Sequence, residues 1–273
     1  MSSPFPASLV LVGAGKMGGA MLDGWLAAGL EAKRVTVIDP LPSEELKAQA
    51  KACGFALNPE LAAMKAPEIL VLGIKPQMLD AAAPTLKPLA SATTLVVSIL
   101  AGKTIGNLAS RLPDARAIVR AMPNLPASVG RGITGAVASQ AVTPQQKDQA
   151  HFLLSGVGKV EWVDHEDLID AVTGVSGSGP AYVFYLVECL AKAAEAEGLP
   201  PDLAERLARA TIEGAGELLH RSEHSPAVLR QNVTSPGGTT AAGLQILMAD
   251  DGLQPLIKAT VNAARKRAEA LSG

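Results

Sequence analysis

The stretch from Leu9 to Ala28 most constrains what this chain can fold into. Four apolar residues, Leu9 to Val12, are followed by glycines at positions 13, 15 and 18. A short apolar run bounded by glycine predicts a buried strand, and the apolar residues at helical spacing from Gly19 to Ala28 predict a helix. The glycines match G-x-G-x-x-G, which permits a tight turn, a close pyrophosphate approach and tight helix packing. This stretch therefore predicts a dinucleotide site, with the pyrophosphate at the positive end of the helix.

A second strand run distinguishes this site from an ordinary tight turn, which three glycines could also form in a chain that holds 26 of them. Val35 to Ile38 is apolar enough for a strand and ends at Asp39, 21 residues after Gly18. The dinucleotide fingerprint places at this position an acid that binds the adenine ribose hydroxyls. Asp39 therefore favours a bound dinucleotide.

Further strand runs alternate with helical or proline-rich segments, which predicts βαβ units and a parallel sheet. These runs are Ile69 to Leu72, Leu95 to Ile99, Ala117 to Val119, Ile133 to Ala138 and Lys159 to Val163. Ligands on such sheets lie beyond the carboxyl ends of the strands. The residues at those ends are Asp39, Gly73 to Pro76, Leu100 to Gly102, and Met122 to Asn124.

Two polar residues near these ends have an ordinary explanation beside the functional one. Lys75 could be a solvated lysine, or the 73–76 backbone could face a nicotinamide. Asn58, ahead of Pro59, is typical of a turn.

The pattern changes near Val163. Before it, Thr143, Pro144 and Gln146 predict a capped helix start. After it, helix follows helix, so we place the domains at residues 1–163 and 164–273.

Apolar residues at helical spacing in the second half predict buried helix faces. They are Val183, Leu186, Val187 and Leu190 on one helix, and Leu203, Leu207, Ala210, Gly214 and Leu218 on the next. Faces rich in Ala and Leu often pack against another subunit, so we expect a homo-oligomer, with an isolated bundle as the alternative.

Composition narrows the possible partners. The net charge is −2 and aromatic residues make up 3%, so a nucleic-acid partner is not expected. Cys53 and Cys189 lack C-x-x-C partners, which favours free thiols in a reducing compartment. Met1 to Ser8 carries no Lys or Arg, and no apolar run approaches 18 residues. We therefore expect a soluble, cytoplasmic protein with no signal peptide and no membrane span.

The segment from Asn232 to Thr240 is a second chemical candidate. Two glycines and two threonines lead into a predicted helix from Ala241 to Met248. A helix N-terminus lined with free N–H groups and hydroxyls suits a carboxylate or phosphate, although an ordinary capping turn would look the same.

Two long motifs carry a resemblance to a known family. They are D-L-I-D-A-V-T-G-V-S-G-S-G-P-A-Y at residues 167–182 and S-P-G-G-T-T at residues 235–240. Together with the glycine turn, I-K-P at 74–76 and M-P-N at 122–124, they make the chain similar to pyrroline-5-carboxylate reductase over essentially its whole length.

The resemblance implies a fold and a reaction. The fold would be an α/β Rossmann-type N-terminal domain, residues 1–163, followed by an all-α dimerisation domain, residues 164–273. The reaction would reduce 1-pyrroline-5-carboxylate to L-proline with NADPH or NADH, in a homodimer or a ring of dimers.

The resemblance also implies site residues, with Thr240 as the catalytic one and no metal ligand. Those carried over for the cofactor are Val12, Gly13, Ala14, Gly15, Lys16, Met17, Gly18, Asp39, Asn58, Ile74, Lys75, Pro76, Ala101 and Glu166. Those carried over for the substrate are Asn232, Gly238, Thr239 and Thr240. The run from His220 to His224 spells the H-x-x-E-H of some zinc proteases, but it falls at a helix end just before Ser225 and Pro226, where solvated residues are expected.

Two other functions and the choice of cofactor stay open at this point. A β-hydroxyacid dehydrogenase would have a lysine on the helix after its glycine-rich motif, and Pro180 to Leu190 contains none. A non-catalytic NAD(P)-binding regulator would show no turnover. Asp39 would repel the 2′-phosphate of NADPH, whereas Ser43 and Lys47 could reach it.

Overall fold

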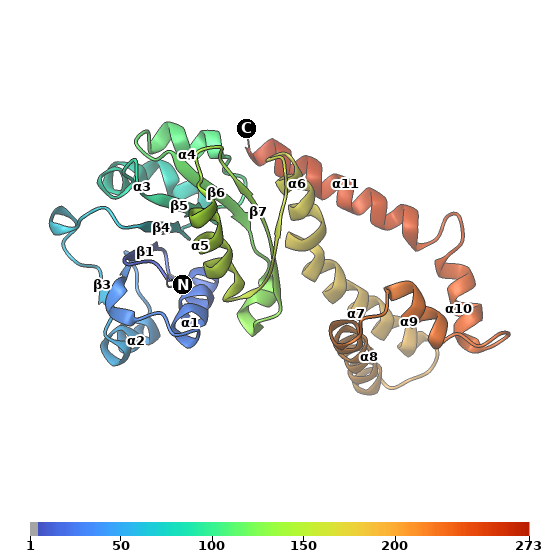
Figure 1. Ribbon diagram of the computed structural model, residues 1–273. Helices are drawn as coiled ribbons and strands as arrows, with labels where there is room; N and C mark the ends of the chain where they lie inside the picture. Colours follow the sequence, from blue (N-terminus) through green and yellow to red (C-terminus); the bar gives the residue numbers. More distant parts are fainter. Residues whose placement is uncertain (1–4, 273) are drawn as a thin grey trace. The chain divides into compact units, whose positions relative to one another are not determined.

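The computed structural model describes residues 5–272, which form two compact units (Figure 1). The first unit takes in the described residues up to Gly177 together with those from Ala264 onward, and the second is Ser178–Ala263. The predicted division at residue 163 follows the change of sequence pattern. The compact units differ from it because α6 (Leu168–Val172) packs on the sheet and the end of α11 (Leu253–Ser272) belongs to the first unit.

The first unit is built on one sheet, whose strand order is β3-β2-β1-β4-β5-β6-β7-β8. The strands are β1 Leu9–Val12, β2 Val35–Ile38, β3 Ala56–Leu57, β4 Ile69–Leu72, β5 Leu95–Ser98, β6 Ala117–Met122, β7 Gly132–Ala138 and β8 Gly158–Trp162. Neighbouring strands pair in parallel from β3 through to β6, and β7 with β8, whereas β6 and β7 are antiparallel. The predicted strands are confirmed to within a few residues at their ends.

The prediction of a parallel sheet is wrong at this one pair. The link from β6 to β7 contains only the short 3₁₀ turn Leu125–Val129. A parallel connection needs a crossover of about a dozen residues or more, usually a helix. Since this link is too short for that, β7 must run back alongside β6.

Helices follow most strands and then fill the second unit. In the first unit they are α1 Lys16–Ala27, α2 Glu44–Cys53, α3 Leu79–Leu86, α4 Ile105–Arg111, α5 Pro144–Ser155 and α6. In the second they are α7 Gly179–Ala196, α8 Pro201–Arg221, α9 Pro226–Asn232, α10 Thr239–Leu247 and the start of α11. Short 3₁₀ turns also occur at Ala32–Arg34, Leu61–Ala63, Pro76–Met78 and Lys87–Leu89, and a π-helical turn at Thr173–Gly177. The predicted capping box of Thr143 and Gln146 begins α5.

The sheet is covered on both faces, which explains why its central strands are apolar throughout. Because side chains alternate along a strand, Leu9 and Leu11 pack on one face against α1 and α5. On the other face Val10 and Val12 pack with residues of α3 and α4. The indole N–H of Trp25 in α1 donates to the Leu153 carbonyl of α5 at 2.7 Å. Two apolar layers therefore hold the strands rigidly and fix where their ends lie.

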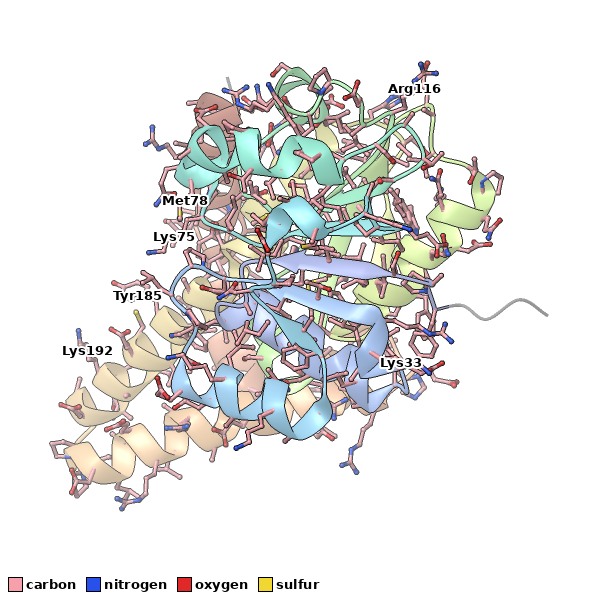
Figure 2. The ribbon with its side chains drawn as sticks, turned by 90° about the vertical axis from the view of Figure 1, so that its left-hand side faces the viewer. Lys33, Lys75, Met78, Arg116, Tyr185 and Lys192 are labelled. Carbon is pink, nitrogen blue, oxygen red and sulfur yellow. The ribbon has the colours of Figure 1, made fainter. Side chains whose placement is uncertain are left out.

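The two edges of the sheet carry different residues (Figure 2). Lys75 and Met78, which follow β4, point outward at one edge, whereas Lys33 and Arg116, which precede β2 and β6, lie at the other. The strand ends predicted to bind a ligand therefore share the edge that carries Lys75.

The second unit has little apolar core of its own. The buried residues of α7 and α8 are the alanines Ala191, Ala204 and Ala208. The faces predicted to be buried are exposed in the single chain, with Val183 at 43%, Leu207 at 47% and Leu218 at 63% exposure. This exposure agrees with the expected homo-oligomer, in which another subunit covers these faces, whereas an isolated bundle would have buried them within one chain. Helical spacing shows that a face must be covered but does not show by which molecule.

No helix within residues 5–272 combines the length and the apolar character needed to cross a membrane. Cys53 and Cys189 are both free, as predicted, and both are exposed.

Candidate functional site

A pocket of about 350 Å³ lies at the carboxyl edge of the sheet. It is lined by Gly15, Lys16, Met17, Gly73, Ile74, Lys75, Pro76, Ile99, Ala101, Met122 and Pro123. The structure therefore brings the glycine turn together with the loops after β4, β5 and β6. Met122 and Pro123 were named among the strand-end residues where a ligand is expected, but they were not carried over as cofactor residues. Ile99, at the end of a predicted strand, was missed.

The three glycines of the turn have different surroundings. Gly13 has φ +90°, and a Cβ there would lie 2.8 Å from the backbone of Gly73 and Ile74. A Cβ on Gly18 would lie 2.1 Å from the Gly13 carbonyl oxygen. A Cβ on Gly15 would meet nothing within 4 Å. Two glycines are thus required by the fold, whereas the third leaves open space in front of the helix.

The N-terminus of α1 is free to bind an anion. Gly15 caps the helix without a side-chain hydrogen bond, and the first turn contains no acidic residue. The unpaired N–H groups and the helix dipole favour negative charge at this end. The turn therefore fits the pyrophosphate of a dinucleotide, and Val12 to Gly18 are the residues that would hold it.

Asp39 is fixed beside the same turn. Its Oδ2 accepts from the Ala14 N–H at 2.9 Å and its Oδ1 from the Leu41 N–H at 2.9 Å. Asn58 bonds both backbone groups of Asp39, through its Oδ1 at 2.8 Å and its Nδ2 at 2.7 Å. Asn58 has φ +49°, a left-handed conformation that Asn adopts more readily than most residues. The two residues predicted at the adenosine end are therefore brought together with the glycine turn.

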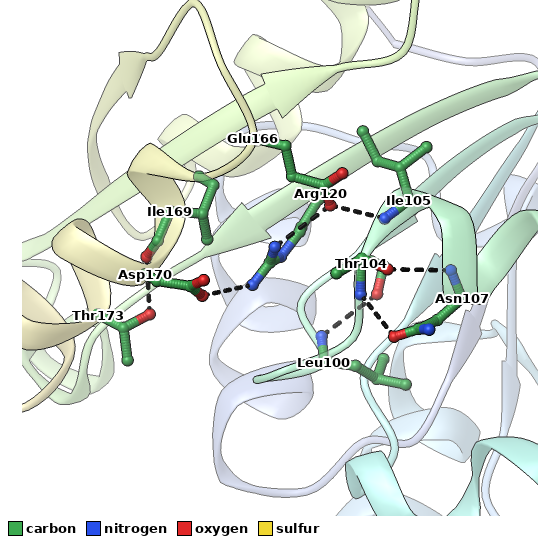
Figure 3. A network of polar contacts seen from close by, with 10 residues as sticks. Leu100, Thr104, Ile105, Asn107, Arg120, Glu166, Ile169, Asp170 and Thr173 are labelled. Carbon is green, nitrogen blue, oxygen red and sulfur yellow. Dashed lines mark hydrogen bonds and ion pairs between the residues drawn. The ribbon is translucent and has the colours of Figure 1, made fainter. Parts of the chain in front are cut away.

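An ion network holds the loop after β5, which contains Ala101 (Figure 3). The Arg120 side chain is 4% exposed and donates to Glu166 Oε1 at 3.2 Å and to Asp170 Oδ1 at 3.1 Å. Glu166 Oε1 also accepts from the Ile105 N–H at 2.6 Å, at the start of α4. Arg120 on β6 therefore links the start of α6 to the start of α4.

Sequence reasoning placed Glu166 near the cofactor and missed Arg120. A lone arginine within the apolar run Ala117–Met122 was the signal available, because a buried arginine needs carboxylate partners. In the structure the Glu166 carboxylate is hydrogen-bonded to Arg120 and to the Ile105 N–H. Ile105 lies four residues after Ala101 in the chain.

The predicted substrate residues lie in the second unit, on the surface of the single chain. Asn232, Thr239 and Thr240 are exposed. Gly238 caps α10 without a side-chain hydrogen bond, and the first turn of that helix contains no acidic residue. A neighbouring pocket of about 470 Å³, lined by residues of α9 and α10 such as Arg230 and Leu244, contains none of the predicted substrate residues.

The H-x-x-E-H run is divided by the end of α8 at Arg221, and α9 starts at Pro226 with Ser225 as its cap. Across the part of the chain that the structure describes, no group of three or more His, Cys, Asp or Glu side chains could hold a metal ion.

The sheet, the glycine turn and the pocket define a dinucleotide-binding protein of the Rossmann type. Two family models match the chain: Pyrroline-5-carboxylate reductase dimerisation over residues 166–271, and NADP oxidoreductase coenzyme F420-dependent over residues 8–102. A pyrroline-5-carboxylate reductase of Pseudomonas aeruginosa is 37% identical over 272 residues, covering 100% of this chain and 98% of that protein. The chain belongs to the pyrroline-5-carboxylate reductase family of NAD(P)-dependent oxidoreductases, and it carries the dimerisation domain of that family.

Solved structures are similar over the same extent. A pyrroline-5-carboxylate reductase from Coxiella burnetii has a TM-score of 0.90 at 35% identity, covering 98% of this chain and 99% of that one. A Plasmodium falciparum pyrroline carboxylate reductase solved with NADP bound has a TM-score of 0.79 at 26% identity, covering 98% of each chain. Membership of the family favours the reductase over the β-hydroxyacid dehydrogenase.

We predict that Gly15→Asp leaves the fold intact and weakens binding of NADH and NADPH by at least about tenfold, because a carboxylate would face the pyrophosphate. Gly18→Ala should instead lower the stability, since its Cβ would overlap the Gly13 carbonyl. Nucleotide titration and urea unfolding measure the two effects. Unchanged nucleotide affinity in Gly15→Asp would contradict the assignment of the turn.

We predict that Arg120→Met lowers the free energy of unfolding by about 3–5 kcal/mol, because it leaves the buried Asp170 and the partly exposed Glu166 without their cation. The matched control is Arg209→Met on α8, whose ion pair with Glu213 is 72% and 66% exposed and should contribute under about 1 kcal/mol. Urea unfolding at one fixed protein concentration compares them. Equal losses in the two variants would show that burial of the network does not matter.

Proposed function

We propose that this protein reduces 1-pyrroline-5-carboxylate to L-proline with NAD(P)H, the last step of proline biosynthesis. The observation that carries this function is the pocket that joins the uncapped start of α1 to the loops after β4, β5 and β6, in a member of this family. Bound NAD(P)H would supply the hydride that the imine carbon accepts.

The first half of the chain would hold the cofactor by separate contacts along its length. Val12 to Gly18 would bind the pyrophosphate at the start of α1, and Asp39 with Asn58 would bind the adenosine end. Ile74, Lys75, Pro76 and Ala101 would line the nicotinamide end, where the pocket lies. Much of the rate should come from positioning, since hydride transfer needs the two carbons roughly 3–3.5 Å apart.

Glu166 would act at this end through the backbone. Its carboxylate accepts the Ile105 N–H while Arg120 holds it in place, so it fixes the loop that contains Ala101. Its predicted place beside the cofactor is compatible with this role.

The second half would bind the substrate through the start of α10. The N–H groups of Thr239 and Thr240 are suited to its carboxylate, because no side chain caps this helix end. The Gly238 N–H donates to the Ser235 carbonyl at 3.1 Å, so Gly238 would contribute through its place at the helix cap. Asn232 would add a polar contact. The Thr240 hydroxyl would donate a hydrogen bond to the ring nitrogen as it becomes an amine; a threonine hydroxyl is too weak an acid to do more than orient or relay the proton.

We also assign residues 1–163 to the cofactor and 164–273 to substrate binding and dimerisation. The exposed apolar faces of α7 and α8 support a homodimer, or a ring built from dimers. The balanced charge and the free cysteines favour a cytoplasmic protein whose partners are its substrate and its own copies.

One assay tests the reaction. Purified protein with pyrroline-5-carboxylate should consume NADH or NADPH, followed by absorbance at 340 nm, and yield L-proline. Tight cofactor binding without any turnover would instead favour the non-catalytic regulator. Turnover of linear hydroxy acids alone would favour the β-hydroxyacid dehydrogenase.

Thr240→Val removes the hydroxyl at nearly constant size. We expect kcat to fall by about 10²-fold or more, while the affinity for the reduced cofactor stays the same. Thr93→Val, at an exposed turn before β5, is the matched control and should keep full activity. A Thr240→Val variant with unchanged kcat would remove this hydroxyl from the mechanism.

A further inference from the structure

The segment after β2, residues 39–47, determines what charge the adenosine end of the cofactor can carry. A ribose with two free hydroxyls suits a carboxylate at the end of this strand, whereas a 2′-phosphate is usually met by an arginine nearby. A relative of this chain was solved with NADP bound, so family membership alone does not decide which dinucleotide this chain prefers.

Asp39 is held in place as a hydrogen-bond acceptor. Its two oxygens receive the N–H groups of Ala14 and Leu41, and Asn58 clamps its backbone from both sides. These hydrogen bonds hold the carboxylate, and with it the negative charge of the aspartate, beside the glycine turn. A 2′-phosphate at this position would face a fixed charge of the same sign.

The groups that could offset this charge are already engaged. The Lys47 ammonium lies 2.7 Å from Glu44 Oε1. The Ser43 hydroxyl caps α2 by accepting from the Leu46 N–H at 3.2 Å. Ser43 and Lys47 are the two side chains that, from the sequence, could have reached the 2′-phosphate of NADPH.

The start of α2 supplies no free positive end either. Its first turn contains Glu44 and Glu45, whose negative charges offset the positive end of the helix dipole. Hydrogen bonds from its own backbone N–H and from Ser43 hold the pKa of Glu45 below its usual value, so this carboxylate is ionised at neutral pH. By contrast, α1 begins with no acidic residue.

Residues 39–47 thus present three carboxylates and one ammonium, and they contain no arginine. We propose that this segment makes NADH the preferred cofactor by repelling the 2′-phosphate of NADPH. This proposal rests on the proposed function only in taking a nicotinamide dinucleotide as the ligand.

Equilibrium binding without substrate tests this preference. Titration of the full-length protein, followed by nucleotide fluorescence, should give an affinity for NADH at least about tenfold above that for NADPH, because like charges repel. AMP should likewise compete better than 2′-phospho-AMP, which isolates the adenosine end. Raised salt should narrow both differences, since exposed charges are screened. Equal or tighter binding of NADPH would overturn the preference.

A variant with increased NADPH binding tests which residues cause the preference for NADH. Leu41 is 88% exposed and lies beside Asp39, so Leu41→Arg adds a cation at the surface without disturbing the core. It should tighten NADPH binding by about tenfold and change NADH binding by less than about threefold. The matched control is Ala92→Arg, which adds the same charge at the exposed turn before β5, where the ratio should not move.

A second variant acts without adding an arginine. Glu44→Gln removes a carboxylate and releases Lys47, so the NADH to NADPH affinity ratio should fall. Unchanged ratios in both Leu41→Arg and Glu44→Gln would overturn the role of this segment. A protein that prefers NADH yet forms no proline would refute only the proposed function, whereas one that binds neither dinucleotide would refute both.

Discussion

The close contact between the glycine turn and the loop after β4 is the constraint on which the rest of the structure depends. Gly13 and Gly73 face each other, and a Cβ on either one would lie 2.8 Å from the backbone of the other. β1 and β4 are parallel neighbours in the sheet, so the segments that follow them start side by side. This contact sets the start of α1 next to Lys75 and thereby forms one wall of the pocket.

Local patterns were sufficient to predict most of the first unit. Leu9–Val12 and Ile69–Leu72 are apolar at every position because both faces of the sheet are covered, and the structure confirms both strands. The start of α5 was predictable because Thr143 and Gln146 satisfy each other's backbone groups within one turn. Site residues were predictable where they follow such strands, as the pocket-lining Lys75 and Ala101 do.

The remaining features depend on contacts between distant parts of the chain. Nothing in Ala117–Met122 shows that Arg120 pairs with Glu166 and Asp170, which are 46 and 50 residues away. The reversed direction of β7 follows from the length of a link, which the strand pattern does not contain. The exposed faces of α7 and α8 show the same limit, because their spacing is helical whatever covers them.

Because of those exposed faces, the second unit depends for its stability on a second copy of the chain. Within it, α7 and α8 meet through small alanines, while larger side chains such as Phe184, Leu207 and Leu218 are left to water. Burial of apolar area is the main favourable term in folding. Much of the free energy that stabilises these helices is therefore gained only when two copies associate. Dilution should therefore act on this protein as a denaturant does, and a solitary chain would be a short-lived species rather than a smaller version of the enzyme.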